Sequence, residues 1–300
     1  MNKKLFLVYF CLVLSMIFWG FSFVGTKISL EALTPITLIL SRLVVASVFL
    51  LLLTKTFGWL QPIKKADLKW FILLTFFEPL CYFLGETFGL QYVSSTLGAV
   101  LIATIPLFVP WAAWMLFREK VSLLNLIGIV ISIVGVVMII FERDFSFNVS
   151  VTGIILLMIA VFSAVGYTMI IRHISNSYSP ITIITWQNLM GIVAFLPLFF
   201  IFDFHSFHFS LFSTKIIYTI VFLGIFPSSL SYAFFTYAIK ELGVNRSSIF
   251  TNLIPVLTAI FAYFLMDEEL PGIKIAGITV VVVALTISQI NYKNIFSGNQ

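Results

Sequence analysis

The stretch WFILLTFFEPLCYFLGETFGLQY, residues 70–92, is apolar and long enough to cross a bilayer as a helix. Its interior nevertheless contains Glu78, Pro79, Tyr82 and Glu86. Side chains four positions apart share one helix face, so positions 78, 82 and 86 predict a polar stripe within the span. A carboxylate near the bilayer centre costs about 2.5 kcal/mol or more, and such groups face a protein interior or a water-filled cavity. The stripe is therefore either a substrate or proton pathway or a kinked packing helix whose carboxylates bind neighbouring donors.

The composition of the whole chain is that of an integral membrane protein. Of its 300 residues, 61% are hydrophobic and 10% are charged, whereas about a quarter of the residues in soluble proteins are charged. The net charge of +5 does not indicate nucleic-acid binding, because the basic residues form no dense patch. The two cysteines lie in apolar runs and form no metal-binding motif. We expect no metal and no cofactor.

Apolar windows of about 20 residues divide the chain into a succession of membrane spans with no room for a soluble domain. Turn-forming or charged residues separate the windows. The predicted fold is an all-α membrane protein with ten transmembrane helices, at about 5–27, 34–54, 68–90, 95–117, 121–141, 151–171, 180–202, 214–239, 244–266 and 271–290.

The distribution of lysine and arginine predicts the orientation. Of the 17 basic residues, Arg42 lies within a span, and Lys27, Arg143, Lys215 and Lys274 lie on the side opposite the N-terminus. The remaining twelve lie at the termini or on the same side as the termini. By the positive-inside rule both termini are cytoplasmic, and we expect the protein in a bacterial cytoplasmic (inner) membrane.

The two halves of the sequence repeat each other. Pro35-Ile36-Thr37 matches Pro180-Ile181-Thr182 at an offset of 145, and Ile105-Pro106 matches Ile254-Pro255 at an offset of 149. Five spans per copy is an odd number, so the second copy enters the membrane from the opposite side. Residues 5–141 and 151–290 therefore predict two inverted five-helix repeats, an architecture of many secondary transporters. Pro79 and Pro227 also correspond approximately, and matched helix breaks mark binding sites in such folds.

With these features the chain resembles the EamA-type proteins of the drug/metabolite transporter superfamily over nearly its whole length. The resemblance rests on an ordered set of short motifs in each copy. In the first copy they are Phe18-Trp19-Gly20, Pro35, Arg42, Pro106, Arg118-Glu119, Gly128 and Gly135; in the second they are Pro180, Tyr232 to Gly243, Ile254-Pro255, Asp267-Glu268 and Gly277. It implies export or exchange of small metabolites, such as amino acids or related compounds, by alternating access through a central cavity. Glu78 and Glu86 are not part of the family motif, and Gln187 stands where the first copy has Arg42.

Polar and aromatic side chains within the spans are the candidate substrate-binding or coupling residues. Arg42 lies at a depth that either carboxylate could reach, and its role is either structural or that of a clamp for an anionic group. Two carboxylates near one arginine leave an excess negative charge, so protons are a candidate coupling ion, with Glu78 as the carrier. We expect Trp111 and Trp114 to form cavity walls. The complete set of candidates is Trp19, Arg42, Glu78, Tyr82, Glu86, Trp111, Tyr167, Gln187, Asn188, Tyr232 and Asn252.

Other function classes are less well supported by the sequence. An intramembrane enzyme needs a nucleophile with its base, or a metal cluster, and no such set converges in the predicted spans. A channel would be expected to contain a filter or re-entrant element, and the sequence shows no sign of either. The alternative of a polytopic membrane protein with an enzymatic or channel role stays open, but a non-enzymatic transporter is the favoured hypothesis, with a small-molecule substrate and the lipid bilayer as its partners. The sequence does not indicate the oligomeric state.

Overall fold

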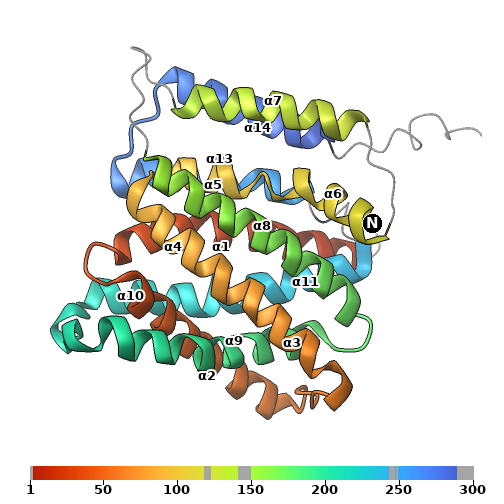
Figure 1. The fold of residues 1–300 in the computed structure, drawn as a ribbon, viewed down its shortest axis with the longest axis vertical. Coiled ribbons are helices and arrows are strands. Elements are labelled where there is room, and N and C mark those ends of the chain that lie inside the picture. The colour runs from red at the N-terminus through yellow and green to blue at the C-terminus, as the bar shows by residue number, and fades with distance from the viewer. Residues whose placement is uncertain (1–2, 118–122, 141–149, 243–246, 248, 289–300) are drawn as a thin grey trace, which may run out of the picture.

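The computed structural model describes residues 3–117, 123–140, 150–242, 247 and 249–288. Every regular element in these ranges is helical (Figure 1). Seven helical segments are long and apolar enough to cross a membrane, and three shorter apolar helices correspond to the other predicted spans. The predicted all-α membrane fold with ten spans is confirmed, and the short helices border stretches outside the described residues.

The elements follow one another in the order that the apolar windows predict. The first half contains α1 (Lys3–Ser29), α2 (Pro35–Phe57), α3 (Leu68–Thr75), η2 (Phe76–Cys81), α4 (Tyr82–Tyr92), α5 (Ser95–Ile102), α6 (Ile105–Phe117) and α7 (Leu123–Ile140). The second half contains α8 (Val151–Ile174), α9 (Pro180–Leu198), η3 (Phe199–Asp203), α10 (Thr214–Ile225), η6 (Phe226–Ser231), α11 (Tyr232–Leu242), η7 (Ile249–Asn252), α13 (Leu253–Met266) and α14 (Gly272–Ser288).

Helix boundaries coincide with residues of the expected chemistry. Pro35 and Pro180 open α2 and α9, where the missing proline N–H would have had no helical partner. The Ser179 side chain caps α9 by accepting a hydrogen bond from the Thr182 N–H. At the other end of α2, Gly58 adopts φ 66°, a left-handed conformation that glycine enters without steric cost.

Two spans are interrupted at matching positions in the two halves. Helices α3 and α4 are joined through η2, where Glu78 has φ −146° and ψ 119°, and α10 and α11 are joined through η6, which contains Pro227. Proline removes a backbone donor and clashes with the preceding turn, so the helical ladder opens there. The predicted polar stripe is consequently carried by a broken helix, with Glu78 in the break and Tyr82 and Glu86 on the helix after it.

Glycines let the helices approach closely around the first interruption. A side-chain Cβ at Gly85 on α4 would lie 2.5 Å from the Leu156 carbonyl oxygen of α8. One helical turn later, a Cβ at Gly89 would lie 2.8 Å from Leu157. This Gly-xxx-Gly face therefore presses α4 onto α8, which is the small-residue packing that membrane helices favour.

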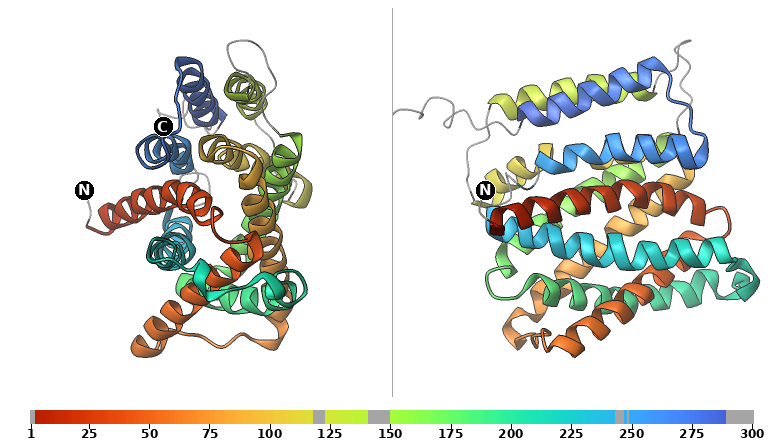
Figure 2. Two further views of the ribbon diagram at one scale, coloured as in Figure 1. Left: turned by 90° about the vertical axis from the view of Figure 1, so that its left-hand side faces the viewer. Right: turned by 180° about the vertical axis from the view of Figure 1, so that it is seen from behind.

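Helices α7 and α14 form a separate pair beside the rest of the bundle (Figures 1 and 2). Small residues again allow the close contact. A Cβ at Gly135 would lie 2.9 Å from the Gly277 carbonyl oxygen, and a Cβ at Gly277 would lie 2.8 Å from the Gly135 carbonyl oxygen. These helices are the fifth and tenth of the predicted spans.

The antiparallel helices α2 and α9 cap each other. Buried Asp203, at the end of η3, accepts hydrogen bonds from the backbone N–H and the hydroxyl of Thr37 in the first turn of α2, at 2.9 and 2.8 Å. Reciprocally, the chain after α2 reaches the start of α9, where the Ser179 N–H donates to Gln61 Oε1 at 2.9 Å. Each helix thus begins against the chain that continues beyond the other.

Candidate functional site

A cavity of about 110 Å³ lies where the interrupted helices of both halves meet. Side chains from α1, α2, η2, α4, α5, α6, α8, α11, η7 and α13 line it, whereas α7 and α14 contribute none within the described part of the chain. Since a single water needs roughly 10–15 Å³ on this measure, the cavity has room for several waters or for one compact solute.

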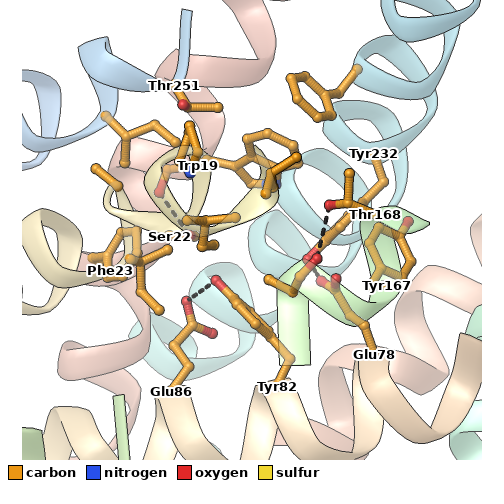
Figure 3. Close-up of a pocket in the computed structure, with 18 of the residues that line it drawn as sticks. Trp19, Ser22, Phe23, Glu78, Tyr82, Glu86, Tyr167, Thr168, Tyr232 and Thr251 are labelled. Carbon is orange, nitrogen blue, oxygen red and sulfur yellow. Dashed lines mark hydrogen bonds between the residues drawn. The ribbon is translucent and has the colours of Figure 1, made fainter. Parts of the chain in front are cut away.

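The carboxyl groups of Glu78 and Glu86 both reach this cavity (Figure 3). Glu78 and Glu86 are 2% and 3% exposed, so each depends on protein partners or on a solute. Glu78 accepts a hydrogen bond from the Tyr232 hydroxyl of the second half, and Glu86 Oε1 accepts one from the Tyr82 hydroxyl at 3.3 Å. The two carboxyl groups therefore have different hydrogen-bond partners.

Arg42 is a fixed part of the wall. Its Nε donates to Ser228 Oγ at 2.6 Å, and its guanidinium carbon lies 4.4 Å from the centre of the Phe83 ring. Its Nη1 lies 4.0 Å from Glu86 Oε2, which is an ion-pair contact but is too long for a hydrogen bond. Arg42 thus joins α2 to η6. Of the two carboxylates of the cavity, Glu86 is the one that forms an ion-pair contact with the Arg42 guanidinium.

Aromatic rings from both halves form another part of the cavity wall. Trp19 donates its indole N–H to the Pro227 carbonyl oxygen at 3.3 Å and packs edge-on against Tyr232, with ring centres 5.1 Å apart. Tyr167 also packs edge-on against Tyr232, with ring centres 6.2 Å apart, and its hydroxyl donates a hydrogen bond to Gln187 Oε1 at 3.2 Å. These bonds hold the rings in place, so the cavity presents rigid aromatic faces.

The structure brings seven of the predicted residues to the cavity and separates four from it. The seven are Trp19, Arg42, Glu78, Tyr82, Glu86, Tyr167 and Tyr232. Gln187 lies behind Tyr167, Asn188 donates to the Ile184 and Ser228 carbonyl oxygens at 2.9 and 3.3 Å, and Asn252 donates to Thr286 Oγ1 at 3.2 Å. These three amides therefore join neighbouring helices, a common use of polar side chains inside membrane proteins.

The expectation that Trp111 and Trp114 form cavity walls is corrected by the structure. Their side chains are 37% and 51% exposed, and neither ring lines the cavity. The residues of α6 that do line it are Ile105, Pro106 and Val109. Trp111 follows Val109 by two positions, a rotation of about 200° around a helix, so its ring points away from the cavity.

Sequence reasoning missed several polar residues of the site. Ser22, Thr168 and Thr251 line the cavity, and Ser228 holds Arg42 from behind the wall. Serine and threonine are common in membrane helices, so their type alone is a weak signal. The sequence repeat offers a better signal for Ser22. Ser22 lies 145 positions before the candidate Tyr167, and 145 is the offset that relates the starts of the two halves.

The cavity crosses the middle of the bundle. Its lining residues extend toward the end that carries the N-terminus at Thr168 of α8 and Ile239 of α11, and toward the opposite end at Phe23 of α1 and Glu86 of α4. At the opposite end, the Lys27 ammonium donates to the Leu90 and Val93 carbonyl oxygens, each at 2.6 Å. Lys27 thereby ties α1 to the end of α4, where unpaired helix carbonyls favour a cation.

Comparison with known proteins supplies the family context for this geometry. The model of the EamA-like transporter family matches residues 6–141 and again residues 151–289. The chain is 28% identical over 279 residues to an uncharacterized transporter of Archaeoglobus fulgidus, covering 92% of this chain and 96% of that protein. It is 26% identical to the uncharacterized transporter YdfC of Bacillus subtilis, with 92% and 89% of the two chains covered.

Two further likenesses come from a plant protein and from a solved structure. A WAT1-related chloroplastic protein of Arabidopsis thaliana is 26% identical over 290 residues, which cover 93% of this chain and 69% of that protein. A solved crystal structure superposes with a TM-score of 0.70 at 14% identity, covering 97% of this chain and 99% of the other. At that identity the superposition supports the fold alone.

Proposed function

Because the chain belongs to the EamA-like transporter family and is an integral membrane transporter, we propose that it is a secondary transporter that exports or exchanges small metabolites, such as amino acids or related compounds, by alternating access. The observation that carries this proposal is the buried cavity with two carboxyl groups, built from interrupted helices of both halves. Such interruptions position substrate and ion sites in transporters with inverted repeats. Residues 5–141 and 151–290 are the two units whose relative movement would alternate access.

The polar lining gives individual residues their proposed roles. Glu78 is the proton carrier, because its hydrogen-bond partner is a tyrosine hydroxyl of the other half and a proton gained or lost there would alter that contact. Glu86 is the fixed counter-ion of Arg42. Trp19, Tyr82, Tyr167 and Tyr232 form the walls against which a substrate would pack.

The proposed orientation places both termini in the cytoplasm of a bacterial cell, with the protein in its inner membrane. The excess of basic residues on the side of the termini supports it. On this orientation the contacts of Lys27 with Leu90 and Val93 lie on the outer side of the cavity. A cysteine introduced at Ser206 should react with a membrane-impermeant thiol reagent added to intact cells. Reaction only after the cells are opened would reverse the orientation.

Counterflow in proteoliposomes tests the transport proposal. Vesicles loaded with each member of a panel of amino acids and other metabolites should take up the labelled form of at least one of them, without a matching ion conductance. The Glu78→Gln variant copies the neutral acid in shape and should flatten the dependence of uptake on pH. Glu31→Gln is the matched control, because Glu31 is an exposed partner of Lys215 outside the cavity. An unchanged pH profile in Glu78→Gln would remove the proton-carrier role, and conductance in place of counterflow would indicate a channel.

A further inference from the structure

One oxygen of the cavity lacks a hydrogen-bond partner. Glu86 Oε2 is buried and accepts no hydrogen bond from the described part of the chain, although Glu86 Oε1 is bonded to Tyr82. Its nearest cation is Arg42 Nη1 at 4.0 Å. A buried carboxylate oxygen without a donor loses its hydration without compensation. An oxygen of this kind on a cavity wall is suited to a donor that a ligand brings.

Arg42 is less suited to bind the ligand. Its Nε donates a hydrogen bond to Ser228, and its guanidinium packs over Phe83. These contacts fix the orientation of the side chain and occupy one of its hydrogen-bond donors. The cavity lining contains one guanidinium and two carboxyl groups, and no lysine of the described chain is among its residues. With both acids ionised, the lining carries a net charge of −1.

From this arrangement we propose that Glu86 Oε2 binds the protonated amino group of a compact monocationic amine. The proposal rests on the transport function and specifies its substrate class. Trp19 and Phe23 line the same cavity and would face the apolar part of the amine, and an aromatic face also attracts a cation. The volume of about 110 Å³ limits the ligand to a compact molecule.

Charge balance selects the amine over related ligands. A monovalent cation brings the filled cavity to neutrality, whereas a zwitterionic amino acid leaves its charge at −1 and a carboxylate increases it to −2. Uncompensated charge in a buried site is costly. A proton on Glu78 would neutralise the empty cavity equally well, so the amine and the proton are alternatives. Each bound amine would then release one proton.

Three ligands that share a phenyl ring and differ in charge test the proposal. Isothermal titration of the purified full chain in detergent at neutral pH would use 2-phenylethylamine, phenylalanine and 3-phenylpropionate, which carry charges of +1, 0 and −1. We expect the amine to bind most tightly and its binding to release protons, which titrations in two buffers of different ionisation enthalpy detect. Equal or tighter binding of phenylalanine or of 3-phenylpropionate would overturn the proposal, as would binding of none of the three.

Variants identify the oxygen. Glu86→Gln should weaken amine binding by a factor of about ten to a hundred, because the charged ammonium then donates its hydrogen bond to a neutral amide oxygen instead of a carboxylate. Glu31→Gln, outside the cavity, should bind the amine as the unchanged protein does. Should Glu86→Gln fail to fold, Tyr82→Phe leaves both charges in place and frees Glu86 Oε1. It should change amine affinity without changing the order of the three ligands. Unaltered amine affinity in folded Glu86→Gln would overturn the assignment.

The same ligands in proteoliposomes separate this inference from the transport function. Tight amine binding without flux would support the site and contradict the transporter. Flux of phenylalanine that Glu86→Gln leaves intact would support the transporter and overturn the amine site.

Discussion

Ser228 shows how a single uncharged side chain can determine the charge distribution of the cavity. It is 1% exposed and receives the Nε–H of Arg42, while its backbone carbonyl oxygen receives the Asn188 amide. Arg42 therefore depends on a residue of the opposite half for its direction. Because the guanidinium lies over Phe83 and beside Glu86, its rotation would alter the environment of the free Glu86 oxygen.

Replacing Ser228 by alanine should therefore cost more than a typical serine substitution. The change leaves Arg42 Nε buried without its acceptor, and we expect the free energy of unfolding to fall by about 1–3 kcal/mol. Thermal unfolding in detergent, followed by circular dichroism, measures the effect. The control is Ser210→Ala, at an exposed position, which should leave the midpoint unchanged. Equal midpoints for the two variants would show that Ser228 does not hold the guanidinium.

At the scale of the element, the glycine face of α4 positions Glu86. Gly85 and Gly89 seat the helix against α8, and Glu86 follows Gly85 directly. The atoms opposite Gly85 are backbone atoms of α8, the Leu156 carbonyl oxygen and the Ala160 nitrogen, at 2.5 and 2.9 Å from an added Cβ. Backbone of a packed helix cannot turn aside as a flexible side chain can. A methyl group there must separate α4 from α8.

The Gly85→Ala variant should lower the free energy of unfolding by about 1–3 kcal/mol, the usual cost of overpacking. Gly272→Ala is the matched control, because a Cβ at Gly272 on α14 would have no atom within 4 Å. Thermal unfolding should show a lower midpoint for the first variant and an equal or higher one for the second, since alanine favours a helix over glycine. A lower midpoint for Gly272→Ala with none for Gly85→Ala would contradict the packing argument.

The sequence predicts elements better than contacts. Span length and the prolines reveal the ten apolar segments and the breaks near Glu78 and Pro227, because both depend on local chemistry. The partner of Arg42 could not be predicted, because Ser228 reaches it only through the packing of the two halves. Trp111 was misplaced for a related reason, since near Pro106 and Pro110 a shift of two residues turns a ring from the cavity to the outer surface.

At the scale of the whole molecule, the two ends of the bundle differ although its halves repeat. Phe23 lines the cavity, and beyond it the end opposite the N-terminus is packed by apolar side chains such as Leu90 and Leu97. There Leu90 lies so close to Gly98 that a Cβ at Gly98 would approach its side chain to 2.6 Å. Lys27 completes the closure through the Leu90 and Val93 carbonyl oxygens. Alternating access requires this end to open, and Lys27 is the polar contact that must break.

The Lys27→Met variant should shift the protein toward the state that is open at the end opposite the N-terminus. Methionine keeps the apolar length of lysine and removes the two charged hydrogen bonds, each typically worth about 1.5–3 kcal/mol. The reporter is Ala103→Cys, on the cavity wall, in a chain whose Cys11 and Cys81 are replaced by alanine.

A membrane-impermeant thiol reagent added on the side opposite the N-terminus should label this cysteine several-fold faster in the Lys27→Met background. Lys215→Met is the matched control, because Lys215 forms an exposed ion pair with Glu31, and such pairs contribute little. Labelling of that variant should equal that of the parent. If Lys27→Met also labelled at the parent rate, the closure would rest on the apolar packing of Phe23 and Leu90 with Gly98 alone, and the lysine would serve only to terminate α4.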